Sequence, residues 1–446
     1  MKTPNSIRAR VAGNPWLLAL ATALLAVGYL LQSASPLRLN TDAIVLLSIG
    51  DTVAAGQGFH FHGLPTHFPP GYPAMLAGLN LLGVASSAAF ILLNCAFVAV
   101  TFIAAYHVYR RPLGFSPAGA LGLCCLGLLS FVLVKHVTIP LSDVPFMGLF
   151  TLALWFAARA GAGPGWEWGW LVLALLTTVA ALSVRTAGVV LLPAFVWLLG
   201  VRCLPRWVAL RRKFPPLIWI LPAGCLILGL GFALLISQTR YFAEMKAVYF
   251  QTGVADRLLN NLLVHGTEMG EICVNLPAAK APALLQPAYP LAGLLLAGLI
   301  LRGVWLRRPL FGVLEVTLLA YMGLIFAWPY FDARFWLPVF PLMIPYVALA
   351  LGDAARLRFF QCAGPAAKTW FALAGLAALA YSTKISWAGT RFPDVYGNGT
   401  LSPTYRAAFL GQTNLVTNGD PLQSDALRLL QRYDSVTRKV AGHGGN

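Results

Sequence analysis

Long apolar runs separated by short basic segments constrain this chain more than any other feature. The first covers residues 15–33, similar runs recur through most of the sequence, and only 11% of the 446 residues are charged. A soluble domain carries about 25% charged residues. Because a membrane-spanning helix needs roughly 20 apolar residues, the pattern predicts an all-α polytopic membrane protein with about 11 transmembrane helices.

The expected spans and the charges between them give the chain an orientation. Spans are expected at 15–33, 85–108, 116–134, 145–160, 167–184, 186–200, 215–236, 286–301, 310–328, 335–351 and 368–383. With the N-terminus inside, most basic residues before residue 384 lie on the inner side and most acids lie on the outer side, as the positive-inside rule requires. The net charge of +17 therefore indicates basic inner loops and contact with membrane lipids, and no nucleic-acid partner.

Polar stretches outside the spans divide the chain further. We expect residues 1–383 to form one transmembrane domain with a first outer loop at 34–84 and a long outer loop at 237–287. Residues 384–446 are expected to form a small appendage on the outer face. The seven cysteines show no paired metal spacing and predict no disulfide framework.

The first outer loop contains the most suggestive carboxylate, Asp42. It precedes an apolar run with helical spacing, Ala43 to Ala55, which Gly56-Gln57-Gly58 ends. This predicts a short amphipathic helix along the membrane surface. Asp42 either caps that helix or takes a proton from an acceptor hydroxyl or amine at the membrane boundary. Asp51 cannot replace it, since it lies about two and a half turns further along.

Two arginines at the outer edge of the spans are candidates for anion binding. Arg185 lies in a tight corner between two apolar runs, and Arg334 lies beside Asp332 at the start of another run. Each arginine could simply lay its apolar stem along the membrane layer so that the guanidinium group reaches water, without binding a ligand. Alternatively, the planar guanidinium groups bind a phosphate carried on a lipid.

Other polar residues on the outer side have two interpretations each. Asp143 follows Ser142 at the start of a span, so it could be a helix cap, and Lys135 and His136 precede it across a short turn. His60 and His62, together with His67, could bind a metal, but His-x-His is a weak signal and solvated histidines are the alternative. The sequence implies no required cofactor, and a divalent metal has no further support.

Four segments in combination resemble one family. The first loop combines Asp42 with Ala54-Ala55-Gly56-Gln57-Gly58-Phe59 and His67-Phe68-Pro69-Pro70-Gly71-Tyr72-Pro73. Later segments are Ser142-Asp143-Val144-Pro145-Phe146, Val184-Arg185-Thr186-Ala187-Gly188 and the run from Asp332 to Pro341. Residues 15–351 thus resemble the membrane glycosyltransferases with the GT-C fold, in the bacterial branch related to protein O-mannosyltransferases and the lipid A aminoarabinose transferase. This chain departs from many members by having Ala43 where they carry a second acid.

The resemblance implies an inverting transfer of a hexosyl or pentosyl group from a polyprenyl-phosphate donor to a lipid, glycan or protein acceptor. Asp42 would be the base. The expected substrate-binding and phosphate-binding residues are Arg334, Arg185, Asp143, His67, Tyr72, Lys135 and His136. The enzyme would lie in a bacterial-type inner membrane with its site facing the periplasm.

Two other functions remain open from the sequence. A lipid or solute transporter would place ionisable residues near the bilayer midplane and show paired repeats. Here the ionisable residues gather on one face and no repeat is seen. A ligase or polymerase of surface polysaccharide would also transfer a glycosyl group, but from a lipid-diphosphate donor.

Overall fold

A computed structural model gives the fold of residues 15–66, 68–161, 167–200, 246–249, 251, 253–354, 358–391 and 421–434. Within these ranges nearly all regular structure is helical, and the strands β1 (His60–Phe61) and β2 (Leu64–Pro65) form one short antiparallel hairpin. The α-helices are α1 (Pro15–Leu31), α2 (Thr41–Ala54), α3 (Gly71–Leu81), α4 (Ser87–Arg110), α5 (Pro117–Leu128), α6 (Phe131–Val137), α7 (Asp143–Ala160), α8 (Trp168–Val184), α12 (Val254–Val274), α13 (Tyr289–Leu306), α14 (Val313–Phe326), α15 (Phe340–Ala354), α16 (Arg358–Arg391) and α18 (Pro421–Tyr433).

The prediction of an all-α polytopic membrane protein is confirmed. In the described part of the chain, three helices are long and apolar enough to cross a membrane: Trp16–Ala34, Ser87–Arg110 and Ala283–Leu306. The bent pair α5 and α6, whose axes differ by 60°, gives a fourth if it counts as one span. The expected total of eleven is not confirmed, and the expected span at 215–236 lies outside the described residues.

The break between α5 and α6 is stabilised by one side chain from a distant loop. Asn275 accepts a hydrogen bond from the backbone N–H of Phe131 at 2.8 Å and donates one to the carbonyl of Leu129 at 2.8 Å. Backbone groups freed by a helix break inside a membrane need such partners. Lys135 and His136 lie in the last turn of the redirected helix α6.

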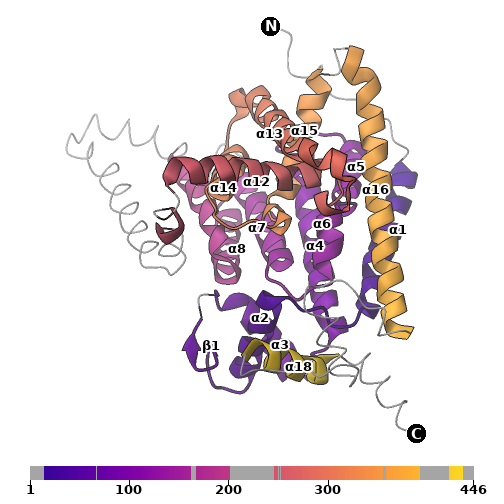
Figure 1. Ribbon diagram of the computed structural model, residues 1–446. Coiled ribbons are helices and arrows are strands. Elements are labelled where there is room, and N and C mark those ends of the chain that lie inside the picture. Colours follow the sequence, from indigo (N-terminus) through magenta and orange to yellow (C-terminus); the bar gives the residue numbers. More distant parts are fainter. Residues whose placement is uncertain are drawn as a thin grey trace, which may run out of the picture.

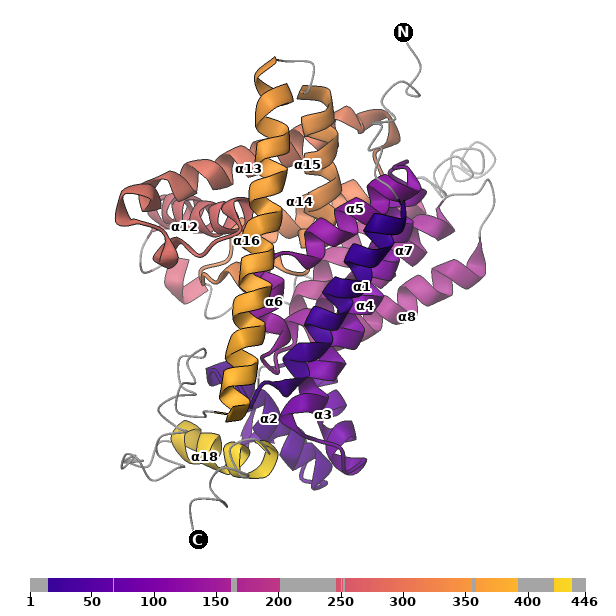
Figure 2. The same cartoon turned by 90° about the vertical axis from the view of Figure 1, so that its right-hand side faces the viewer.

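Two long helices run along one side of the bundle. Figures 1 and 2 both show α1 and α16 as neighbours. Gln32, just after α1, donates to the Thr383 hydroxyl at 2.7 Å and accepts from the Ser382 hydroxyl at 2.7 Å. Helix α16 runs without interruption through the expected domain boundary at 383 to Arg391.

Helix α12 crosses the face of the bundle and packs closely on α13 (Figure 1). The approach depends on glycines, since a Cβ at Gly293 would lie 1.8 Å from the carbonyl oxygen of Gly266. A Cβ at Gly270 would lie 2.1 Å from the carbonyl oxygen of Tyr289. Gly266 and Gly270 have the four-residue spacing of small residues at helix contacts in membranes. This packing fixes the position of α12 relative to α13.

The first outer loop forms the predicted helix and a second one. Helix α2 covers the run expected to be helical, and α3 begins in the Pro-Pro-Gly-Tyr-Pro segment. Helix α18 packs against α2 at the same end of the molecule, as both ribbon views show (Figures 1 and 2). The apolar side of α18 is buried, with exposures of 0% to 3%, at Ala426, Leu429, Leu430 and Tyr433.

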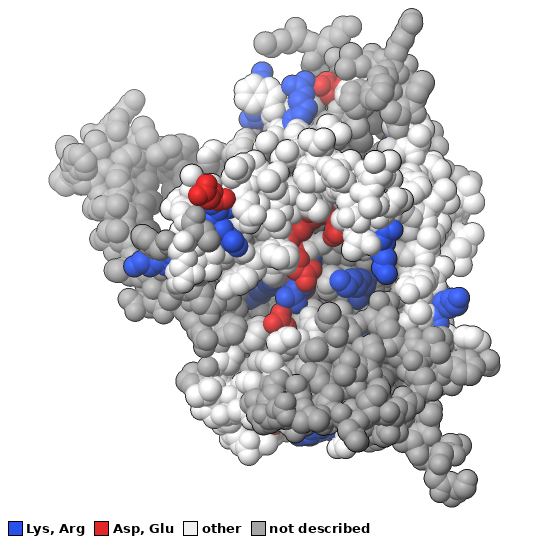
Figure 3. All heavy atoms as spheres, viewed as in Figure 1, with Lys and Arg blue, Asp and Glu red and all other residues white. Residues whose placement is uncertain are grey.

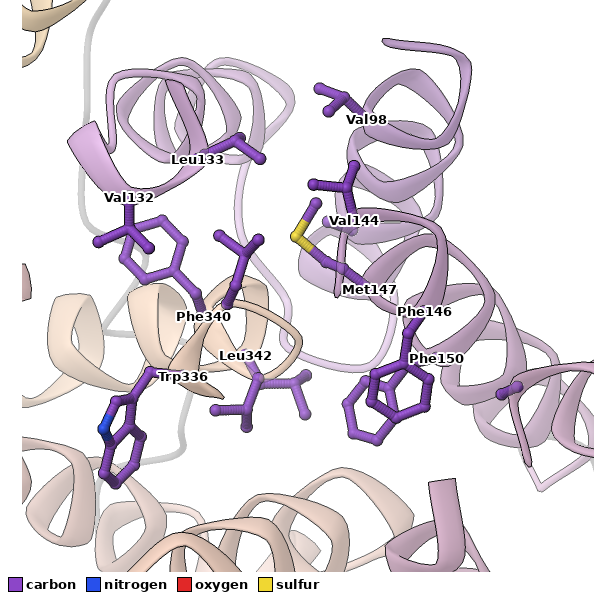
Figure 4. Close-up of a cluster of buried hydrophobic side chains, with 14 of the residues drawn as sticks. Val98, Val132, Leu133, Val144, Phe146, Met147, Phe150, Trp336, Phe340 and Leu342 are labelled. Carbon is purple, nitrogen blue, oxygen red and sulfur yellow. The ribbon is translucent and has the colours of Figure 1, made fainter. Parts of the chain in front are cut away.

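An apolar cluster joins the helices that carry the outer-face charges. It draws on α4, α6, α7, α15 and the turn that precedes α15 (Figure 4). The labelled members are Val98, Val132, Leu133, Val144, Phe146, Met147, Phe150, Trp336, Phe340 and Leu342. Close packing of this kind resists small displacements, so it fixes the ends of α6 and α7 relative to residues 332–336.

Candidate active site

Asp42 does not cap its own helix. The side chain of Asn40 is the cap, because its Oδ1 accepts a hydrogen bond from the N–H of Ala43 at 2.8 Å. The capping interpretation of Asp42 is therefore wrong. Its carboxylate instead accepts a hydrogen bond from Arg334, with 2.6 Å between Nη2 and Oδ2, and its side chain remains 35% exposed. The first turn of α2 also favours an anion there through the helix dipole.

Arg334 lies among three carboxylates. It belongs to the 3₁₀ turn Ala333–Trp336, which Asp332 caps by accepting from the N–H of Arg334 at 3.0 Å. The Nε of Arg334 also lies 3.3 Å from Oδ2 of Asp332. Burial alone would lower the pKa of Arg334, but Asp143, Asp42 and Asp332 raise it well above its ordinary value. The guanidinium group therefore stays charged.

A second ion pair lies beside the first. Arg185, at the C-terminal end of α8, pairs with Asp143 in the first turn of α7. The ring of Phe335 contacts both arginines, with its centroid 5.3 Å from the guanidinium carbon of Arg185 and 5.3 Å from that of Arg334. Such cation–π contacts restrict both guanidinium groups. Four distant segments thus bring their charges together, and Figure 3 shows acidic and basic side chains gathered in a hollow below α12.

A cavity of about 460 Å³ adjoins these ion pairs. Lys135 and His136 line it, as Asp332 does. Burial would raise the pKa of Asp332, but His136 and Arg334 lower it below the ordinary range. The remaining lining residues are Phe131, Val132, Val264, Thr267, Glu268, Glu271, Pro277, Phe331 and Ala333.

Two acids of this cavity were not singled out from the sequence. Oε2 of Glu268 lies 2.7 Å from Nδ1 of His265 and accepts a hydrogen bond from Nε1 of Trp336 at 2.9 Å. Oε1 of Glu271 accepts from the N–H of Ala278 at 2.8 Å. Glu268 is buried on an otherwise amphipathic helix, and the His-x-x-Glu spacing, which places both side chains on one face, was the available signal.

Tyr72 lies behind the ion pairs and does not reach the cavity. Its side chain is 0% exposed, and its hydroxyl has no hydrogen-bond partner among the described residues. Burial and the nearby Asp143 raise its pKa far above the ordinary value. His67, the other residue expected from the same segment, lies outside the described residues.

The loop histidines lie apart from the ion pairs. His62 Nε2 lies 3.0 Å from Oδ2 of Asp425 in α18, and Nδ1 of His60 accepts from the N–H of Gly63 at 3.3 Å. The described ranges contain no group of three or more His, Cys, Asp or Glu residues that could hold a metal ion. Metal dependence of the site stays untested.

Asp51 has a role that the sequence did not reveal. It is buried between α2 and α18, where it pairs with Arg428 and accepts hydrogen bonds from the Tyr433 hydroxyl and from Asn80 at 3.0 Å. Ser48 and Asp425 add a 2.7 Å hydrogen bond between the same two helices. This α2–α18 contact lies below a second cavity of about 370 Å³ and supports the helix that carries Asp42.

Replacing Asp51 by Ala is expected to lower the free energy of unfolding by about 2 kcal/mol, because the buried carboxylate and the hydrogen bonds that it accepts are lost, whereas Arg428 stays partly solvated. The transition is measured on purified protein in detergent. Asp353→Asn is the matched control, since it alters an exposed pair with Arg302. An equal shift in both variants would show that the α2–α18 contact is only a surface ion pair.

Comparison with known proteins supports one fold. A model of the dolichyl-phosphate-mannose-protein mannosyltransferase family matches residues 67–230. No match was found among curated protein sequences. The oligosaccharyltransferase from Archaeoglobus fulgidus, solved with zinc and sulfate, superposes with a TM-score of 0.51 at 15% identity, over 90% of this chain and 56% of that one.

Two further solved structures are similar at a lower level. ArnT from Cupriavidus metallidurans, bound to undecaprenyl phosphate, gives a TM-score of 0.47 at 14% identity, over 97% of this chain and 78% of that one. The archaeal oligosaccharyltransferase AglB from Archaeoglobus fulgidus, with an inhibitory peptide and a dolichol-phosphate, gives 0.47 at 14% identity, over 92% of this chain and 59% of that one. This chain thus spans less than two thirds of the length of the oligosaccharyltransferase.

These findings confirm the resemblance noted from the sequence. The chain is an integral membrane protein with the GT-C fold, and the proteins that it resembles are glycosyltransferases. Each of the four segments that suggested the family contributes one residue to the two ion pairs, Asp42 with Arg334 and Arg185 with Asp143.

Proposed function

We propose that this protein is an inverting glycosyltransferase that moves a hexosyl or pentosyl group from a polyprenyl-phosphate donor to an acceptor at the outer face of the membrane. The observation that carries the proposal is the pairing of a partly exposed carboxylate, Asp42, with a mostly buried arginine, Arg334, at 2.6 Å. The match to a family named for dolichyl-phosphate-mannose chemistry supports the donor class.

In the proposed reaction, Asp42 takes the proton from the acceptor hydroxyl or amine. The acceptor atom attacks the anomeric carbon of the sugar from the side opposite the phosphate. The bond between that carbon and the phosphate oxygen breaks, and polyprenyl phosphate leaves with the electron pair. No acid is needed to protonate the leaving group, because a phosphate is already a good leaving group.

The two arginines would stabilise the charge that develops on the leaving phosphate. The guanidinium groups of Arg334 and Arg185 both contact the Phe335 ring, so they lie near enough to each other to act on one anion. A guanidinium group has five donors in a planar fork, and the contacts of Arg334 with Asp42 and Asp332 do not use them all. Fixed charges of this kind lower the barrier most where the charge appears only in the transition state.

The membrane and the side are part of the same proposal. The acids of the outer loops and the basic inner segments fit a bacterial-type inner membrane with the site facing the periplasm. The acceptor would be a lipid, a glycan or a protein, and the reaction as proposed needs no cofactor.

Transfer by the purified protein in detergent tests the proposal. The substrates are radiolabelled polyprenyl-phosphate sugars, assayed with wild type and Asp42→Asn in parallel. We expect the wild type alone to release polyprenyl phosphate. Turnover only with lipid-diphosphate sugars would indicate a polysaccharide ligase instead, and transport of labelled lipid across vesicles without any turnover would indicate a transporter.

A further inference from the structure

The cavity below α12 has a chemistry of its own. Three carboxylates line it, from Glu268, Glu271 and Asp332, and Lys135 is the one Lys or Arg among the lining residues that the structure describes. A surface with this balance repels a phosphate or an acidic headgroup. It favours hydroxyl groups, amines and other hydrogen-bond donors, since an ionised carboxylate can only accept.

The side chain of Glu268 is held in place by two contacts, but only one of its carboxylate oxygens has a hydrogen-bond partner among the described residues. Its Oε2 contacts both His265 and Trp336, whereas its Oε1 is buried and has no hydrogen-bond partner among the described residues. The side chain is 7% exposed. A buried carboxylate oxygen without a donor is costly, and such an atom at a cavity indicates that a ligand supplies the donor.

Glu271 strengthens the same conclusion. Burial raises its pKa, the N–H of Ala278 lowers it, and the nearby Glu268 raises it again, with a net rise above the ordinary value. The two acids are thus close enough to repel each other. A bound amine or a set of hydroxyl groups would relieve that repulsion.

The cavity also adjoins the proposed reaction centre. Asp332 lines it and at the same time lies 3.3 Å from Nε of Arg334, which in turn holds Asp42. A donor phosphate bound by Arg334 would therefore lie next to a residue that lines the cavity. The volume of about 460 Å³ falls in the range of small-molecule sites, and Phe131 and Phe331 add apolar surface to the lining.

We propose that the cavity lined by Glu268, Glu271 and Asp332 binds the transferred glycosyl group of the donor and selects neutral or amino-bearing sugars over acidic ones. This subsite rests on the proposed glycosyl transfer, and its test is kept separate from the test of catalysis.

Binding measurements on the full-length protein in detergent make that separation. The affinity for undecaprenyl phosphate is compared with that for undecaprenyl phosphate carrying a neutral hexose. We expect the sugar to strengthen binding by about tenfold, as one hydrogen bond to a charged group allows, and Glu268→Gln to remove that gain. The affinity for undecaprenyl phosphate alone should not change. Asp256→Asn, an exposed acid on the same helix, is the matched control and should keep the gain.

A second variant guards against misfolding, because Glu268 also contacts His265 and Trp336. Thr267→Trp fills the cavity from its wall without changing any carboxylate, and it should abolish the gain from the sugar as well. A donor carrying a uronic acid should bind no tighter than the lipid phosphate in the wild type. If the uronic acid bound as tightly as the neutral hexose, or if both cavity variants kept the gain, the subsite would be refuted.

The outcomes also separate the two proposals. A gain from the sugar that depends on Glu268, in a protein that turns over no donor, would support the subsite and refute the transferase. Turnover that depends on Asp42 would support the transferase. If the sugar then gave no gain in affinity, or a gain that the cavity variants left unchanged, the subsite would be refuted.

Discussion

Replacing Asp42 by Asn is expected to lower kcat for glycosyl transfer about 10³-fold, within the range that a general base contributes. Asparagine keeps the size of the side chain and can still contact Arg334, but its amide cannot accept the proton of the acceptor. Asn40 caps α2 independently of residue 42, so the helix should keep its position. The binding of the lipid donor should therefore be nearly unchanged, and the loss should appear in kcat and not in KM.

Initial rates of polyprenyl phosphate release, measured over a range of donor concentrations, give this result directly. The control is Asp256→Asn, which removes a carboxylate from the outer face away from the ion pairs. The unfolding transition of each variant in detergent shows whether the protein is folded. If Asp42→Asn retained more than a tenth of the wild-type kcat, Asp42 would not be the base.

Replacing Arg334 by Ala is expected to lower kcat/KM for the donor about 10²-fold, comparable to the loss of one charge-stabilising group elsewhere. The change removes the partner of Asp42 and Asp332 together, so two carboxylates lose their positive neighbour. Arg334→Lys keeps the charge but loses the planar fork and should recover only part of the activity. An additional structural effect would appear as a lower unfolding temperature.

Donor kinetics distinguish this role from a simple membrane anchor. Arg302→Ala is the matched control, because Arg302 forms an exposed ion pair with Asp353 at 2.7 Å and has no part in the site. If Arg334→Ala retained the wild-type kcat/KM, Arg334 would have no role in donor use and would act only as a membrane anchor whose guanidinium group reaches water.

The sequence predicted best those features of the fold and the site that follow from a single physical rule. Apolar length placed most of the expected spans close to helices of the structure, such as α1, α4 and α8. The outer-edge charges were also found from the sequence, because an ionisable group beside an apolar run is costly unless it has a partner. Their pairing was not evident, since Asp42 and Arg334 lie far apart along the chain.

Features that depend on tertiary contacts were missed. Glu268 looked like one more acid in a polar loop, and only the packing of α12 on α13 buries it beside Trp336. Asp42 looked like a possible cap because the cap rule fits both Asn40 and Asp42, and the backbone decides between them.

The contact between α2 and α18 imposes an order on biogenesis. The segment that carries Asp42 is synthesised early, whereas Arg428 and Tyr433 emerge from the ribosome only after α16 has been made. During that interval Asp51 lacks two of its partners, and α2 lacks the helix that covers it. The contact that buries Asp51 can therefore form only after α18 has been made.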